Sequence, residues 1–313
     1  MSTGPDEEAP FRILSLDGGG AKGFYTLGVL REIEGLTGKR LHESFDLIFG
    51  TSTGAIIASL LALGRSVEEI HTLYKENVVK IMSCSSADDK TAALTKLATN
   101  VYADIGFDAM KTGVGIVATK WALERPMIFK ADSNQAHGRK GTFVPGFGVS
   151  VGEAVVASCS AFPFFERTFV TTSSENRFEL ADGGYCANNP TLYAIADAVE
   201  GLGKSRSALR VISIGVGVYP SPKSTLLSKQ WWIDQWKAVQ LLQKTFEINT
   251  QSMDQLREVL FADVPSVRIS ETYSQPEMAT DMFEHDLNKL NLLLQRGGES
   301  FAKFEGDIAR LLS

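Results

Sequence analysis

Cysteine and histidine are scarce in this chain. Three cysteines, Cys84, Cys159 and Cys186, and four histidines occur among 313 residues. No two cysteines have the close spacing of a zinc-binding pair, and an odd number argues against a disulfide framework. We therefore expect free thiols, no metal site and a reducing, cytoplasmic location.

Long apolar runs and an excess of positive charge are also missing. No apolar run reaches the roughly 18 residues that a membrane-spanning helix needs, and residues 1–10 are polar and acidic, unlike a signal peptide. Lys and Arg number 31 against 37 Asp and Glu, which gives a net charge of −6. This balance disfavours a broad surface for DNA or RNA. A lipid substrate would have to be reached from the aqueous side.

Hydrophobic residues make up 44% of the chain, enough for a large core. No repeat or shift in composition divides the chain, so we expect a disordered acidic tail over 1–10. A single domain is expected over 11–313, with a mainly helical final third. Alternating or continuous apolar patterns predict strands at 11–16, 45–49, 114–119, 126–130, 168–171, 178–181, 209–214 and 267–269. Helices are expected at 24–36, 55–63, 66–81, 90–102, 150–158 and 190–202, with a long loop over 131–148. Two successive strand–helix units at the start predict an α/β fold with a central, mostly parallel sheet covered by helices.

The most informative stretch is Gly50-Thr51-Ser52-Thr53-Gly54, between an expected strand and an expected helix. The order strand, Gly-x-Ser-x-Gly, helix predicts a nucleophile elbow. Such a turn is too crowded for side chains on its flanks, a need that Gly50 and Gly54 meet. It also raises the Ser52 hydroxyl onto a helix N-terminus, where negative charge is favoured. An ordinary turn in which Ser52 caps the helix is the alternative.

A second glycine-rich loop, Gly18-Gly19-Gly20-Ala21-Lys22-Gly23, lies between the first strand and the first helix. Backbone N–H groups at such a place bind an anion, either a phosphate or a transition-state oxyanion. The loop lacks the Lys-Ser/Thr pair that ends a P-loop. We interpret it as an oxyanion hole with Lys22 adding positive charge, and a phosphate site or a simple tight turn as alternatives.

A carboxylate, Asp182, ends the expected strand at 178–181 and is followed by Gly183 and Gly184. An Asp in this position can serve as a general base for a serine, although Asp is also common in turns. A Ser–Asp–His triad would need a histidine later in the chain, and His285 is in the right order. We expect His285 to be a solvated residue of a polar helix face, which favours a dyad.

Together the three motifs resemble the patatin-like phospholipase family, over about residues 11–215. The resemblance implies a three-layer fold and an acyl hydrolase that cleaves membrane glycerophospholipids without a metal or organic cofactor. It implies that Ser52 is the nucleophile, that Asp182 is the base and that the N–H groups of Gly18, Gly19 and Gly20 form the oxyanion hole. The residues expected to support them are Lys22, Gly23, Gly50, Gly54, Gly183 and Gly184.

Within that family the chain also resembles bacterial anti-phage effectors that cyclic dinucleotides switch on. This implies a cyclic dinucleotide as activator, ligand-driven self-association, and peripheral action on the inner membrane from the cytoplasm. No short motif marks the nucleotide site, for which 131–148 and 218–243 are candidates. A lipase without nucleotide control and a nucleotide- or phosphate-binding module are the alternatives. Trp231, Trp232 and Trp236, on an expected helix, would pack in the core or form a membrane-facing lip.

Overall fold

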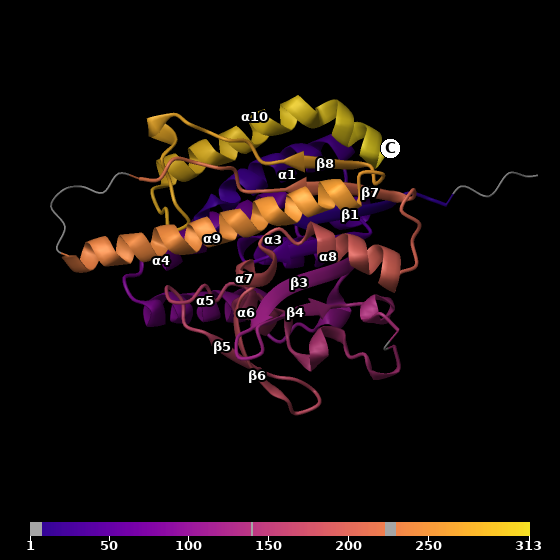
Figure 1. Ribbon diagram of the computed structural model, residues 1–313, viewed down its shortest axis with the longest axis horizontal. Coiled ribbons are helices and arrows are strands. Elements are labelled where there is room, and N and C mark those ends of the chain that lie inside the picture. The colour runs from indigo at the N-terminus through magenta and orange to yellow at the C-terminus, as the bar shows by residue number, and fades with distance from the viewer. Residues whose placement is uncertain (1–7, 139, 223–229) are drawn as a thin grey trace, which may run out of the picture.

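A central sheet organises the molecule (Figure 1). The structure is a computed structural model that describes residues 8–138, 140–222 and 230–313, without the side chains of 230–236. In this part of the chain eight strands form one sheet in the order β5-β6-β3-β2-β1-β7-β8, and β4 also pairs with β3. The strands are β1 (Phe11–Leu16), β2 (Leu47–Thr51), β3 (Gly113–Lys120), β4 (Arg125–Lys130), β5 (Thr168–Thr171), β6 (Arg177–Asp182), β7 (Leu209–Ile214) and β8 (Ser266–Ile269).

Strand direction divides this sheet into two parts. β3, β2, β1, β7 and β8 run parallel to one another, whereas β4 and β6 are antiparallel to β3, and β5 is antiparallel to β6. The parallel strands are buried on both faces, as β1 shows: Ile13 packs on one side of the sheet, and Leu14 and Leu16 pack on the other. The predicted α/β fold with a mostly parallel sheet is confirmed.

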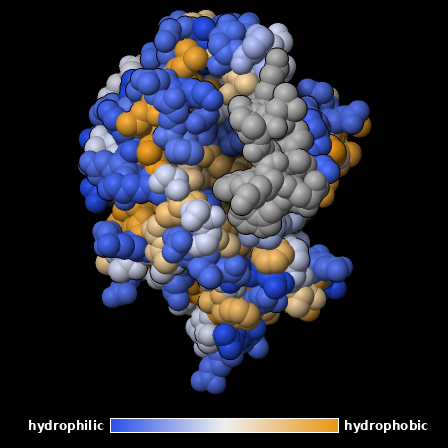
Figure 2. All heavy atoms as spheres, turned by 90° about the vertical axis from the view of Figure 1, so that its left-hand side faces the viewer, coloured by the Kyte–Doolittle hydropathy of each residue, from blue (hydrophilic) through white to orange (hydrophobic). Residues whose placement is uncertain are grey.

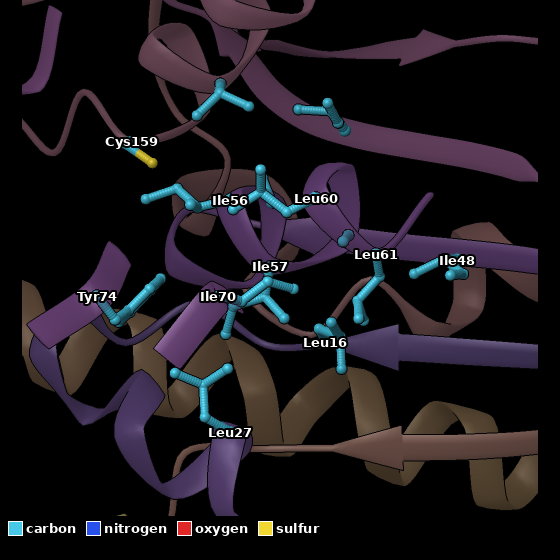
Figure 3. Packing of buried hydrophobic residues seen from close by; sticks show 14 of the residues in the cluster. Leu16, Leu27, Ile48, Ile56, Ile57, Leu60, Leu61, Ile70, Tyr74 and Cys159 are labelled. Atoms are coloured by element: carbon cyan, nitrogen blue, oxygen red, sulfur yellow. The ribbon is translucent and has the colours of Figure 1, made fainter. Parts of the chain in front are cut away.

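Helices cover both faces of the sheet. One face carries α1 (Gly23–Thr37), α3 (Thr53–Ala62) and α10 (Leu287–Leu312), and the other carries α7 (Gly184–Ala187) and α8 (Thr191–Ala196). Figure 3 shows the larger core, where side chains from α3, such as Ile57 and Leu61, meet Leu16 of β1 and Leu27 of α1. The remaining helices are α2 (Leu41–Ser44), α4 (Val67–Ser83), α5 (Ala87–Tyr102), α6 (Val151–Ser158) and α9 (Gln230–Leu260).

The feature that matters most for function is one edge of β3. The first half of β3 pairs with β2, in a register that sets Thr51 opposite Val117. The second half pairs with β6, in a register that sets Asp182 opposite Ala118. Because β4 occupies the other edge of the same residues, β2 and β6 share one edge and run toward each other. Their carboxyl ends therefore meet between Val117 and Ala118.

Most predicted boundaries agree with the structure to within a few residues, and the helix expected at 190–202 differs in its type rather than in its extent. Asn189 Oδ1 accepts a hydrogen bond from the Thr191 N–H at 3.0 Å, and α8 begins at Thr191, one residue later than expected. It ends at Ala196 and continues as a wider turn over Asp197–Gly201. Asp197 is buried there and accepts from Lys130 Nζ at 2.5 Å. The sequence pattern missed this tertiary bond.

Two other segments differ in detail from the expected picture. The loop expected at 131–148 contains three short 3-10 turns, Ser133–Ala136, Lys140–Thr142 and Pro145–Gly148. Of the expected tail, residues 1–7 lie outside the described part of the chain, and Glu8 accepts the Ser205 N–H at 3.1 Å. No helix in the described ranges combines the length and apolar character needed to cross a bilayer.

A close backbone contact between the elbow and β1 yields a stability prediction. A Cβ on Gly54 would lie 2.3 Å from the Leu16 carbonyl oxygen, so Gly54→Ala should destabilise the fold by roughly 2 kcal/mol or more. Gly306 of α10 is the matched control, because a Cβ there meets nothing within 4 Å. Gly306→Ala should stabilise by about 0.5–1 kcal/mol through helix propensity. Urea unfolding followed by circular dichroism measures both changes, and equal effects would contradict the packing argument.

Candidate active site

Ser52 occupies the turn between β2 and α3 in a backbone conformation that few non-glycine residues adopt, with φ 53° and ψ −121°. Its N–H donates to Ser158 Oγ at 2.8 Å, and Ser158 Oγ donates in turn to the Val117 carbonyl oxygen at 2.6 Å. The strained turn is thus held from α6 and β3. A positive φ fixed by surrounding bonds is typical of functional sites, and the predicted elbow geometry is present.

The glycines of the elbow are required by close packing. A Cβ on Gly50 would lie 2.2 Å from the Gly54 carbonyl oxygen, and Gly54 itself lies against Leu16 of β1. Any larger residue at either position would push the turn away from β1. The steric need inferred from the Gly-x-Ser-x-Gly pattern is therefore present.

Two threonines of the same motif connect the elbow to its neighbours, a role that the sequence did not suggest. Thr51 Oγ1 donates to the Ala187 carbonyl oxygen at 2.6 Å, which ties the elbow to α7. Thr53 Oγ1 donates to the Gly20 carbonyl oxygen at 2.7 Å and contacts Tyr74 OH at 2.6 Å. The variable positions of the motif thus fix Ser52 relative to the glycine loop on one side and to the Asp182 segment on the other.

Asp182 ends β6 and is completely buried. Its Oδ1 accepts the Gly184 N–H at 2.7 Å, and within the described residues Oδ2 has no hydrogen-bond partner of regular geometry. Burial raises the pKa of Asp182 to about 7, although the Gly184 N–H and the nearby Ser52 hydroxyl lower it. A carboxylate that titrates near neutral pH, beside a serine hydroxyl, has the properties of a general base.

The thiol of Cys159 completes the buried surroundings of the two groups. Burial raises the pKa of Cys159, the charge of Asp182 raises it further, and an interaction with the Ser52 hydroxyl lowers it. The thiol is therefore neutral and contributes a compact, weakly polar wall. The sequence predicts only that Cys159 is a free thiol, which it is.

The glycine loop lies directly against Ser52. A Cβ on Gly18 would lie 3.2 Å from Ser52 Cβ and 2.4 Å from Asn188 Oδ1. The Gly18 N–H, however, donates to the Asn188 carbonyl oxygen at 3.0 Å, and Asn188 Nδ2 donates to the Gly18 carbonyl oxygen at 3.2 Å. In this conformation Gly18 is therefore not a free donor, which leaves Gly19 and Gly20 as the better placed members of the expected trio.

Charged side chains at the loop are paired rather than free. Asp17 is buried and receives two hydrogen bonds from Arg268 of β8, at 2.9 and 2.5 Å. Lys22 is also buried, and its Nζ lies 3.8 Å from Glu247 Oε1 of α9. Burial lowers the pKa of Lys22, while Glu247 raises it. The positive charge expected beside the loop is thus held by a helix from the final third of the chain.

Helix α9 crosses in front of the sheet and covers the candidate site (Figure 1). Asn249 Oδ1 accepts the Asn188 N–H at 2.8 Å, and Thr250 Oγ1 accepts from Asn188 Nδ2 at 2.8 Å. The ring of Phe246 packs edge-on against Tyr185 at 5.2 Å between centroids. Ser52 is only 7% exposed. The site is closed in this conformation, so a substrate can reach Ser52 only after a conformational change.

His285 takes no part in this arrangement. It is exposed, in the turn that precedes α10, and its Nδ1 lies 3.2 Å from the Phe283 carbonyl oxygen. Its expected exposure is confirmed, but its expected place on a helix is wrong, because α10 begins only at Leu287. The groups that set the pKa of Asp182 include no imidazole.

Comparisons with known proteins place this chain among relatives of known family. The profile of the patatin-like phospholipase family matches residues 14–195. A cUMP-AMP-activated phospholipase from Escherichia coli is 60% identical over 301 residues, covering 96% of this chain and 93% of that protein. A cGAMP-activated phospholipase from Vibrio cholerae is 27% identical over 258 residues, covering 72% of this chain and 70% of that protein. The rabbit calcium-independent phospholipase A2-gamma is 28% identical over 232 residues, covering 67% of this chain and 28% of that protein.

The family match spans more than half of the chain and includes the glycine loop, the elbow and Asp182. With the high identity to a relative of nearly the same length, it leads to one conclusion: this chain belongs to the patatin-like phospholipase family.

Proposed function

We propose that this chain hydrolyses acyl esters of membrane glycerophospholipids with a Ser52–Asp182 dyad. The observation that carries the proposal is the meeting of β2 and β6 on one edge of β3, which sets a strained serine beside a buried carboxylate of near-neutral pKa. Membership of the patatin-like phospholipase family supports the choice of substrate class.

In the proposed reaction Asp182 takes the proton of the Ser52 hydroxyl as the oxygen attacks the ester carbonyl. A Ser52–acyl bond forms, and the ester C–O bond breaks. The leaving lysophospholipid oxygen receives the proton from Asp182. Water then attacks the acyl-enzyme, again with Asp182 as base, and releases the fatty acid and the free hydroxyl of Ser52.

Negative charge on the carbonyl oxygen is proposed to be stabilised by the N–H groups of Gly19 and Gly20. Gly18 joins them only if its bond to the Asn188 carbonyl oxygen opens. Fixed backbone donors are effective because they need no reorganisation when the charge develops. A phosphate-binding role for the loop is less well supported, since the buried carboxylate of Asp17 directly precedes it.

We further propose that a cyclic dinucleotide activates the chain and that the active enzyme degrades the inner membrane from the cytoplasm in antiviral defence. The relatives named as cUMP-AMP-activated and cGAMP-activated phospholipases support this regulation. The closed site supports it independently, because Ser52 and Asp182 are buried and α9 is bonded to Asn188 beside the glycine loop. An activator must favour an open state over this one to produce turnover.

The proposed nucleophile gives the first functional prediction. Ser52→Ala removes the attacking oxygen and should lower fatty-acid release on the order of a million-fold, to background. The fold should survive, because the Ser52 N–H bond to Ser158 involves only backbone on that side. Fatty-acid release from phospholipid vesicles measures the effect, with thermal unfolding as the control. Appreciable turnover by the folded variant would place the nucleophile elsewhere.

The proposed base gives one prediction for turnover and one for stability, and the two change with pH in opposite directions. Asp182→Asn keeps the shape but cannot accept a proton, so turnover should fall by about a thousand-fold or more. In the parent, kcat/KM should rise with pH and level off above about 7, where Asp182 is ionised. His285→Ala is the matched control and should leave turnover nearly unchanged.

The free energy of unfolding should change with pH in the direction opposite to that of kcat/KM. Since the folded protein holds this proton more tightly than the unfolded chain, the stability of the parent should fall as pH rises from about 4 to about 7, the folded pKa of Asp182. A shift of this size corresponds to roughly 4 kcal/mol at most. Asp182→Asn should lack that part of the decline in urea unfolding measured across this range. For turnover, the contradicting outcome is an active Asp182→Asn together with an inactive His285→Ala. The dyad would then be wrong, and a triad or another base would have to replace it.

Regulation is tested by titration. Cyclic UMP–AMP and cyclic GMP–AMP are added to the purified chain with phospholipid vesicles, and fatty-acid release is followed. We expect low activity without ligand and a saturable increase with at least one of them. Moving a population from about 1% to about 99% open requires about 5.5 kcal/mol of differential affinity. Higher salt should weaken activation, because the ligand carries two negative charges. Full activity without ligand would contradict the regulation and leave the hydrolase assignment intact.

A further inference from the structure

The outer face of α9 is the most apolar exposed helix surface in the described part of the molecule. Of the large hydrophobic side chains that are strongly exposed, five belong to this one helix. They are Leu241 at 70%, Ile248 at 61%, Leu256 at 43%, Val259 at 73% and Leu260 at 55% exposed. We call these five residues the α9 stripe. Exposed apolar groups concentrated in this way mark an interaction site more often than scattered ones do.

Helical spacing places the α9 stripe on one side of the helix. Leu241 and Ile248 are seven residues apart, close to two turns, and Ile248 and Leu256 are a further eight apart. From Leu241 to Leu260 the stripe is about 28 Å long at 1.5 Å per residue. The opposite side of the same helix carries Phe246 and Thr250, and Asn249 lies at the boundary between the two sides; all three contact residues of the candidate active site.

The charges on the exposed side are all of one sign over most of the helix. From Lys237 to Leu256, the exposed positions of α9 carry apolar, uncharged polar or cationic side chains: Lys237, Leu241, Lys244, Thr245, Ile248, Gln251, Ser252, Gln255 and Leu256. The two carboxylates in this span are partly buried and paired, Glu247 with Lys22 and Lys244, and Asp254 with Arg257. The whole chain carries a net charge of −6, so this local absence of exposed carboxylates is distinctive.

We propose that the α9 stripe with Lys237 and Lys244 is the surface by which the enzyme docks on a phospholipid bilayer. Aliphatic side chains can enter the interface between headgroups and acyl chains, while flanking lysines approach anionic headgroups. The ion pair between Lys244 and Glu247, at 3.3 Å on the surface, is weak enough to be exchanged for a phosphate. A membrane fits better than a second protein copy because the exposed positions from Lys237 to Leu256 combine apolar residues with positive charge alone, and Glu258, which follows this span, is paired with Arg257.

This inference rests on the proposed function, because the bilayer is then both the docking surface and the substrate. The inner side of the same helix contacts Lys22 and Asn188 of the candidate active site, and its outer side would meet lipid. In Figure 1 α9 lies in front of the sheet, and Figure 2 shows hydrophobic (orange) and hydrophilic (blue) residues side by side along the right-hand edge of the molecule. The side chains of Trp231, Trp232 and Trp236, at the start of α9, lie outside the described part of the chain.

Docking is tested separately from chemistry. Binding is measured by flotation with vesicles of phosphatidylethanolamine and phosphatidylglycerol, with and without cyclic UMP–AMP. The Ser52→Ala background keeps the vesicles intact. Leu241→Gln/Ile248→Gln should weaken binding at least tenfold. Leu123→Gln is the matched control, because Leu123 is 54% exposed but lies in the turn after β3. Lys237→Gln/Lys244→Gln should bind these vesicles about tenfold more weakly, and its binding to vesicles of phosphatidylcholine alone should change little.

Hydrolysis of soluble p-nitrophenyl butyrate, measured with Ser52 restored, should be unchanged in all three variants. Failure of the parent to hydrolyse both this ester and vesicle lipid in the presence of cyclic UMP–AMP or cyclic GMP–AMP would overturn the proposed function instead. The docking proposal is overturned if Leu241→Gln/Ile248→Gln binds vesicles as tightly as the parent does, or if Leu123→Gln weakens vesicle binding as much as that double variant. It is also overturned if the parent binds no vesicles with or without cyclic UMP–AMP. Unchanged vesicle binding with a loss of self-association by the double variant would identify the face as a contact between copies.

Discussion

Two strands that run toward each other along one edge of β3 determine the candidate active site. β2 ends at Thr51 opposite Val117, and β6 ends at Asp182 opposite Ala118. Each strand end delivers one functional group, and the spacing of adjacent residues on β3 fixes how far apart they are. Neither group depends on a long flexible loop for its position. The bonds of Thr51 to Ala187 and of Thr53 to Gly20 then extend this rigid core to the glycine loop.

Burial makes Asp182 a stronger base and at the same time lowers the stability of the fold, and both effects have one cause. A carboxylate in a dry site is a stronger base than one in water, because desolvation raises the free energy of its charged form. The same desolvation opposes folding whenever Asp182 is ionised. The strained backbone of Ser52 is a second local cost, and the bond from Ser158 helps to maintain it. The large core formed by α1, α3 and α10 offsets both costs.

Helix α9 has one side against the candidate active site and the other side exposed to the surroundings of the protein. Its inner side reaches each part of the site: Glu247 meets Lys22 of the glycine loop, and Asn249 and Thr250 meet Asn188 behind Asp182. Its outer side is apolar and cationic. A helix bound on both sides can transmit an event at a membrane or ligand site to buried catalytic groups, because moving it changes contacts on both sides at once.

The sequence alone determined the local parts of this protein. The apolar pattern gave the strands, glycines at 50 and 54 gave the elbow, and an Asp before two glycines gave the proposed base. These features depend on residues close together in the chain, whose steric and hydrogen-bonding needs can be read directly. Contacts between distant residues were decided by the tertiary structure. Asn188 occupies the N–H of Gly18, Glu247 pairs with Lys22, Ser158 supports Ser52, and the covering helix is α9. No local pattern encodes such pairs, because sheet order and helix packing choose which segments meet, and only that choice sets burial and hence the pKa of Asp182.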